Sequence, residues 1–149
     1  DVMKEMTRRL YEYVGREKTD LFDLITATSL AKMRVGAEMP EGYRLIYEAF
    51  LATPDELSEE MKRSFRNTYT EQRAQVLLLV DESKFKPSVS KERAVDLLLA
   101  CTEGIFNRYY ELYRHMTPEE ALPHMDSIRQ ELIESLLLLK SAFYKEEYL

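Results

Sequence analysis

Apolar residues recur every three or four positions along most of the chain, the spacing that places them on one face of an α-helix. The first such run spans residues 2–13 and meets Gly15, a residue type that commonly follows a helix end. A second run reaches about Gly36, and either Thr19 or Asp20 can cap its beginning. The pattern therefore predicts two helices in this first part of the chain.

Proline marks the start of the next two predicted helices. Pro40 stands where a third helix tolerates proline, in its first turn. The run Thr53-Pro54-Asp55-Glu56 combines a capping threonine, a proline at the first helical position and a glutamate that can return the hydrogen bond. No helix breaker intervenes before Asp81, so the sequence predicts a long fourth helix that reaches Val80.

The second half repeats these signals. Ser90 can cap a fifth helix that runs to about His115, and the Thr-Pro-Glu-Glu run at residues 117–120 is a second capping pattern. Pro123 either opens the last helix or separates a short turn from it. We therefore expect residues 1–149 to form a single all-α domain of about six helices, packed as an orthogonal and antiparallel bundle.

The closing segment, Ile128–Tyr144, carries apolar residues over an arc of roughly 180°, whereas a surface helix needs only about a 100° stripe. The fifth helix is similarly wide. To bury such a wide apolar arc, a helix must pack against the core of its own chain on one side and against a partner on the other. The simplest partner is another copy of the chain. Gly104 either allows close approach of another helix or is a tolerated glycine. The expected dimer interface consists of Leu97, Gly104, Ile128, Leu132, Leu136, Leu139 and Phe143.

Polar side chains interrupt the apolar stripe of the fourth helix at Thr68 and Gln72. Buried polar groups need partners, so these two either make hydrogen bonds in the core or contact a ligand. Ten Tyr, six Phe and seven Met suit either an adaptable apolar cavity or a large helical core. The candidate ligand-binding residues are Met6, Leu10, Tyr47, Phe50, Phe65, Thr68, Gln72 and Tyr109.

The net charge and the absence of catalytic and metal-binding motifs argue against several functional classes of protein. The net charge of -6 disfavours a direct grip on a nucleic-acid backbone. No phosphate loop, zinc-binding cysteine pair or His-Glu-x-x-His run occurs, so we expect neither an enzyme nor a cofactor or metal. His115 and His124 flank a helix junction and are more simply surface residues. The single Cys101 fits a reducing compartment such as the cytoplasm, and no apolar run approaches the ~18 residues of a membrane helix.

Two stretches resemble the regulatory domain of TetR-family transcriptional repressors. Residues 94–105, Ala-Val-Asp-Leu-Leu-Leu-Ala-Cys-Thr-Glu-Gly-Ile, are similar to the penultimate helix of that family. Leu136–Leu139 with Lys140, Phe143, Tyr144 and Lys145 resembles its closing helix.

The resemblance implies a homodimer joined by a four-helix bundle, with two helices from each copy. It also implies a cavity for a small apolar or aromatic effector, whose binding shifts the first helix. That family reads DNA through an N-terminal helix-turn-helix, which this sequence does not contain. Because the chain enters a helical pattern at Asp1 without a cap, we expect a fragment that lacks this domain. The alternative is a helical protein-interaction module without a cavity.

Overall fold

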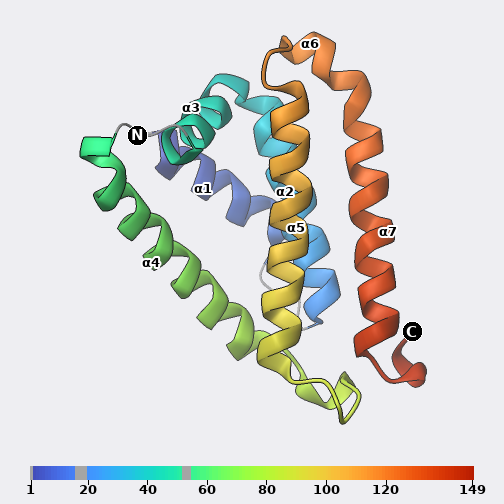
Figure 1. Cartoon of the computed structure of the whole chain (residues 1–149). Coiled ribbons are helices and arrows are strands. Elements are labelled where there is room, and N and C mark those ends of the chain that lie inside the picture. The colour runs from blue at the N-terminus through green and yellow to red at the C-terminus, as the bar shows by residue number, and fades with distance from the viewer. Residues whose placement is uncertain (1, 16–19, 52–54) are drawn as a thin grey trace.

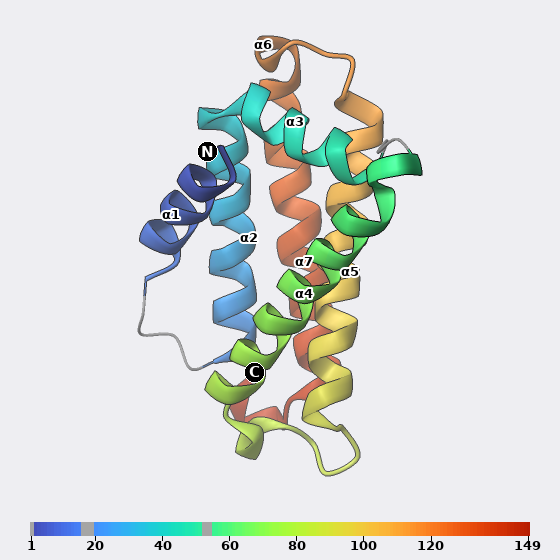
Figure 2. The same cartoon turned by 90° about the vertical axis from the view of Figure 1, so that its left-hand side faces the viewer.

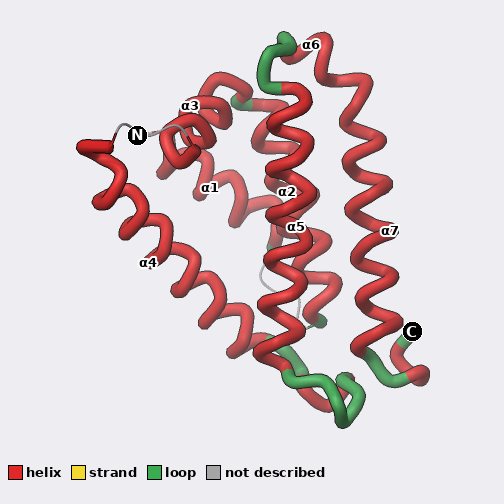
Figure 3. The backbone as a smooth tube through the Cα atoms, viewed as in Figure 1, coloured by secondary structure: helices red, strands yellow, loops and turns green. Residues whose placement is uncertain are grey.

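A computed structural model describes residues 2–15, 20–51 and 55–149, and at residues 46, 47, 49–51, 55–58, 61 and 65 it describes the backbone only. The fold is all-α, as the periodicity predicts, and the described residues form no β-strand beyond one isolated bridge between Phe85 and Tyr144 (Figure 3). The six long helices are α1 (Val2–Val14), α2 (Leu21–Glu38), α3 (Pro40–Leu51), α4 (Asp55–Leu79), α5 (Lys91–Tyr113) and α7 (Met125–Phe143). A single turn, α6 (Pro118–Ala121), lies between the last two.

Three upright helices, α2, α5 and α7, form the body of the molecule (Figures 1 and 2). α1 packs along α2, and α3 turns away at the upper end of α2. α4 runs obliquely and tilts away from α5 toward its own N-terminal end, as Figure 1 shows. Arg73 ties α4 to α5 through two contacts with the Asp96 carboxylate, at 2.5 and 3.1 Å.

Capping residues fix where the helices begin and end. Gly15 adopts a φ of 70° directly after α1, a conformation that glycine enters without steric cost. Ser90 accepts a hydrogen bond from the backbone N–H of Arg93 at the start of α5, at 3.1 Å. The predicted capping box at α6 is present, with Thr117 and Glu120 bonded reciprocally.

The structure decides between alternatives that the sequence leaves open at two helix starts. Asp20, rather than Thr19, caps α2, because its carboxylate accepts from the backbone N–H groups of Phe22 and Asp23 at 2.9 and 3.0 Å. Pro123 does not open the last helix but lies in a separate 3₁₀ turn, η2 (Leu122–His124), that precedes α7. The predicted cap at Thr53 and Pro54 lies outside the described residues.

The core lies where α2, α5 and α7 meet. Leu21, Leu98 and Leu132 are fully buried there, and one side of each helix supplies the remaining apolar contacts. Removing this apolar surface from water is the main favourable term for such a bundle. At the lower end of the core, the Tyr144 ring meets Phe22 and Phe85 edge-on, with ring centroids 4.9 and 5.2 Å apart.

Asp20 connects three segments that are distant in sequence. Besides capping α2, its carboxylate accepts from the Tyr144 hydroxyl at 2.9 Å and from the Lys84 ammonium at 3.1 Å. Partial burial opposes ionisation of Asp20, but the Asp23 N–H, Tyr144 and Lys84 outweigh it, so the pKa of Asp20 lies below its ordinary 3.8. Backbone hydrogen bonds from Lys86 to Phe143 and from Lys145 to Lys84 close the same junction.

We expect Asp20→Ala to lower the free energy of unfolding by about 1 to 3 kcal/mol, because it removes a cap and leaves a buried tyrosine hydroxyl without its acceptor. Because folding depresses the pKa of Asp20, its ionic contribution is complete above pH 3.8 and is lost as the pH falls below that value. Urea titrations of wild type and Asp20→Asn, which keeps a capping oxygen, should therefore converge in acid. A gap between them that widens as the pH falls would contradict this assignment.

Candidate functional site

A cavity of about 380 Å³ opens at the end of the molecule opposite Asp20. It lies among the C-terminal halves of α2 and α5, the first turn of α3, the α6 turn and the first turn of α7. The volume falls in the range of small-molecule sites, about 300 to 1,000 Å³. Its walls are formed by Lys32, Met33, Gly36, Ala37, Pro40, Glu41, Tyr43, Arg44, Phe106, Tyr109, Tyr110, Tyr113, Arg114, Met116, Thr117, Pro118, Glu119, Ala121, Leu122, Met125 and Ile128.

Aromatic side chains of α5 form one wall. Phe106, Tyr109, Tyr110 and Tyr113 follow one another at helical offsets of three, four and seven, which place them on the same side of the helix. The Tyr109 and Tyr113 rings are stacked, with centroids 5.8 Å apart, and Tyr113 stacks in turn on His124 at 4.5 Å. This wall is therefore ordered by ring contacts of its own.

Small residues of α2 form the opposite wall. Gly36 and Ala37 leave room that larger side chains would fill, and Met33 lies one turn earlier. A Cβ atom on Gly36 would meet the Tyr43 ring at 3.4 Å, an ordinary van der Waals distance, so the Tyr43 ring of α3 lies directly beside this wall. The cavity exists because bulky residues on α5 face small residues on α2.

Hydrogen bonding at Glu131 links the aromatic wall to α7. The Tyr109 hydroxyl donates to Glu131 Oε2 at 2.5 Å, and Arg108 pairs with the other oxygen of the same carboxylate. Hydrogen bonds from Tyr109 and Arg108 hold the pKa of Glu131 below its ordinary value, and the bond to Glu131 raises the pKa of Tyr109. The Tyr109 hydroxyl therefore remains a neutral donor, fixed toward α7.

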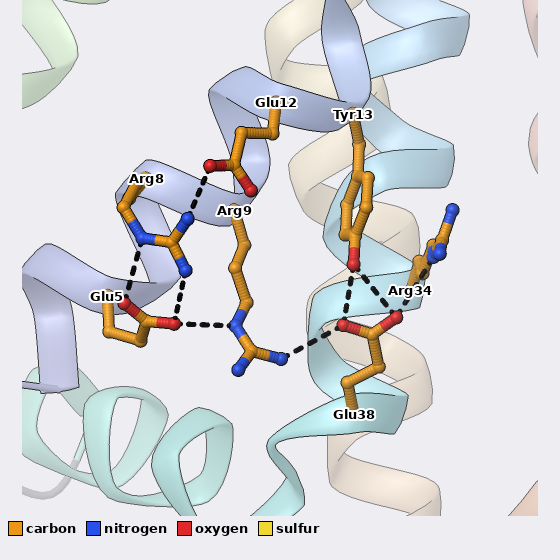
Figure 4. A network of polar contacts seen from close by, with 7 residues as sticks. All are labelled: Glu5, Arg8, Arg9, Glu12, Tyr13, Arg34 and Glu38. Carbon is orange, nitrogen blue, oxygen red and sulfur yellow. Dashed lines mark hydrogen bonds and ion pairs between the residues drawn. The ribbon is translucent and has the colours of Figure 1, made fainter.

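Glu38, the residue after Ala37, anchors α1 to the end of α2 (Figure 4). Its carboxylate accepts from the Tyr13 hydroxyl at 2.7 and 2.9 Å, from Arg9 at 3.1 Å and from Arg34 at 3.0 Å. These donors, Tyr13 first, hold the pKa of Glu38 below its ordinary value. Arg34 also lies over the Tyr13 ring, 3.9 Å from its centroid. The network adjoins the cavity wall and reaches a different helix.

Among the predicted ligand-binding residues, Tyr109 lines the cavity. Met6 and Leu10 are half-buried on α1 and lie outside the cavity walls given by the described residues. Met6 instead packs against the start of α3, where its sulfur would lie 3.5 Å from a Cβ atom on Gly42. α1 is thus a supporting helix for α2 and α3 at this end of the molecule.

Thr68 and Gln72 are exposed on α4, so water can satisfy their polar atoms. α4 tilts away from the body toward its N-terminal end (Figure 1), so only the C-terminal part of its described apolar stripe, at Val76, packs against the core. Neither residue is among the described walls of the cavity. The side chains of the remaining candidates, Tyr47, Phe50 and Phe65, lie outside the described part of the structure.

Of the residues predicted to form the dimer interface, some are buried in the core of the chain itself and others are exposed on its surface. Ile128, Leu132 and Leu136 are 8, 0 and 3% exposed and belong to the core of the chain itself. Leu132 and Leu136 pack in one cluster with buried residues of α2 and α5, and Ile128 lines the cavity. The other candidates are Leu139 and Phe143, which are partly buried against that core, and Leu97 and Gly104, which are exposed.

An exposed apolar surface does exist on these two helices, and we define it as the α5/α7 face. Leu137 and Leu138 are 60 and 71% exposed on α7, and Leu97 is 46% exposed on α5. Leu97, Gly104 and Arg108 share one side of α5 by their spacing, and the pairing of Arg108 with Glu131 places that side next to α7. The α5/α7 face consists of Leu97, Ala100, Gly104, Leu137 and Leu138.

Comparison with known proteins found no matching family model, no matching curated protein and no matching solved structure. Within the described residues, no three His, Cys, Asp or Glu side chains gather closely enough to hold a metal ion. None of the described helices combines the length and apolar character that crossing a bilayer requires. The assignment of function therefore rests on the cavity and on the α5/α7 face.

Sequence reasoning missed most of the cavity. Its clearest signal was the aromatic cluster of Phe106, Tyr109, Tyr110 and Tyr113, which crowds four rings into two turns of one helix. The small pair Gly36 and Ala37 carried a weaker signal, because small residues near a helix end also serve simply to end the helix.

Gly104 gives a direct test of the α5/α7 face. A Cβ atom there would meet nothing within 4 Å in the single chain, so Gly104→Ala should raise the free energy of unfolding of the monomer by about 0.5 to 1 kcal/mol. Urea unfolding at low protein concentration measures this gain. A loss of stability in the monomer would show that Gly104 is needed within the chain itself.

Proposed function

We propose that this chain is the effector-binding and dimerising part of a TetR-type transcriptional regulator, and that its effector is a small apolar or aromatic molecule. The cavity of about 380 Å³ between α2, α3, α5 and α7 is the observation that carries the proposal. Sites for small molecules are lined mainly by hydrophobic and aromatic side chains with a few polar groups, which is the composition of these walls. The resemblance of residues 94–105 and 136–145 to that family supplies the wider context.

We infer that the cavity binds its ligand without changing it. In the described lining, the hydroxyl of Tyr109 is already committed to Glu131, and among the described residues no hydrogen bond or ion pair joins Lys32 to a partner that would orient it as a nucleophile or base. Catalysis needs a nucleophile or a base oriented by a partner, and the described walls do not provide this grouping. Binding is the function that these walls suit.

The second copy would pack on the α5/α7 face. Leu97, Leu137 and Leu138 leave a large apolar surface in water, and a symmetric contact between two such faces would bury it. The exposed Gly104 would let the helices approach closely. The product is a bundle of two helices from each copy, which is the arrangement that the family resemblance implies. A regulator of this kind acts in the cytoplasm.

Transmission of the signal would run through Glu38. A ligand that presses on Gly36 and Ala37 acts on the last turn of α2, and Glu38 on that turn holds Arg9 and Tyr13 of α1. The ligand must favour one position of α1 over another, because only a difference in affinity between two states can shift their populations. A DNA-reading segment joined to α1 would then move with that helix.

Dimerisation is tested by placing a charge on the face. We expect the wild-type chain to be a dimer at micromolar concentration in light scattering, and Leu138→Glu to weaken dimerisation by more than about ten-fold, because two carboxylates would lose water at the interface. Leu78→Glu, at an 86% exposed position on α4, is the matched control and should remain dimeric. Leu132→Glu is unsuitable, since it would place a charge in the core of each chain. A wild-type chain that is monomeric under these conditions would refute this part of the proposal.

Ligand binding is tested by filling the cavity. In a thermal-shift panel of apolar and aromatic compounds, a compound at a hundred times its Kd should raise the free energy of unfolding by about 2.7 kcal/mol. Ala37→Phe should abolish the shift, because Ala37 lines the cavity and a ring at that position would occupy part of its space. Ala74→Phe adds the same ring at an exposed position of α4 and should keep the wild-type shift. Equal shifts in the two variants would place binding elsewhere.

A further inference from the structure

Lys32 lies in the cavity wall at the end nearer the middle of α2, and its side chain is exposed. It is the first residue of α2 in the cavity wall and comes four residues, about 6 Å of helical rise, before Gly36. The α6 turn, at the top of Figure 1, contributes Glu119 to the cavity wall. Between Lys32 and this turn the wall is mainly aromatic and aliphatic. The cavity therefore has one cationic end and a long apolar middle.

The other basic groups of the described cavity wall already have carboxylate partners. Arg44 pairs with Glu41 at 2.7 Å, and Arg114 pairs with Glu111 at 3.6 Å. No carboxylate in the described part of the chain lies within ion-pair distance of Lys32. Among the basic groups of the described cavity wall, the ammonium of Lys32 is therefore the one without a carboxylate partner.

The surroundings of Lys32 make an added anion favourable. Its side chain keeps contact with solvent, yet protein atoms around the ammonium lower its pKa from the ordinary value, and the more distant Glu103 carboxylate only partly offsets this effect. An anion placed beside this ammonium would be attracted to a cation that has no described carboxylate at ion-pair distance and that borders an apolar wall.

We propose that the ligand of this cavity is an apolar or aromatic molecule with a single carboxylate group, and that Lys32 binds this carboxylate while the tyrosine wall of α5 contacts the apolar body. The inference rests on the proposed ligand-binding function and specifies its chemical class. One available ammonium matches a singly charged group. A phosphate or a dicarboxylate would require a second donor of positive charge beside that ammonium.

Matched pairs of ligands separate the charge from the apolar body. We would titrate the wild-type chain with naphthoate and naphthylmethanol, and with decanoate and decanol, by isothermal calorimetry at neutral pH. In the preferred pair the carboxylate should bind about ten-fold more tightly than the alcohol, as expected for a charge-assisted hydrogen bond. The two pairs distinguish an aromatic acid from a fatty acid as the preferred body.

Three variants assign the preference to Lys32. Lys32→Met keeps the length of the side chain and removes the charge, so it should bind both members of the preferred pair with equal affinity. Lys32→Arg should restore most of the preference. Lys62→Met, at an exposed position on α4, is the control and should behave as wild type. Circular dichroism of each variant verifies that the helices are intact.

The outcomes distinguish this inference from the function on which it rests. A carboxylate preference that Lys32→Met removes and Lys62→Met retains supports the inference. Equal binding of acid and alcohol by the wild-type chain overturns the inference and leaves the apolar cavity as a binding site. Failure of all four compounds to bind overturns both. A carboxylate preference that persists in Lys32→Met assigns the anion to another group and overturns the role of Lys32.

Discussion

The contact on which the rest of this fold depends is the carboxylate of Asp20. It caps the N-terminus of α2, and it also accepts hydrogen bonds from the hydroxyl of Tyr144 and the ammonium of Lys84. The segment before α5 and the segment after α7 therefore meet at the beginning of α2. An ionised group that is partly withdrawn from water needs such partners. Because these three helices are joined and tightly packed at one end, they can be less filled at the other end without losing their alignment. The cavity lies at that other end.

Packing differs between the two ends for a reason that is visible in the side chains. Near Asp20, Leu21, Phe22 and Tyr144 interlock closely. Near α6, the residues of α2 become small while those of α5 become large and aromatic, and α3 turns away after Glu38. The large side chains of α5 could in principle turn toward α2 and fill the space beside its small residues. Stacking of the Tyr109 and Tyr113 rings on one another holds them along α5 instead. The space between the two helices therefore stays open.

The sequence predicted the helices far better than the contacts. Caps and prolines act locally, so Ser90 and Thr117 set helix starts that can be identified from a few neighbouring residues. The sequence shows that the apolar arc of α7 is wider than the stripe of an ordinary surface helix, but the width does not indicate which residues face the core. In the structure Leu132 and Leu136 face the core and Leu137 and Leu138 face water. The exposure of Gln72 depends on the tilt of a whole helix, which no short-range pattern encodes.

The carboxylate of Glu131 belongs to two surfaces at once. It holds Tyr109 in the cavity wall, and it holds Arg108 at the border of the α5/α7 face. Under the proposed function, a ligand that displaces Tyr109 would alter the interface, and association of two chains would alter the wall in return, since such coupling is reciprocal. The apparent affinity for the effector would then vary with the concentration of the protein itself. The amount of protein in the cell would thereby set the effector level to which it responds.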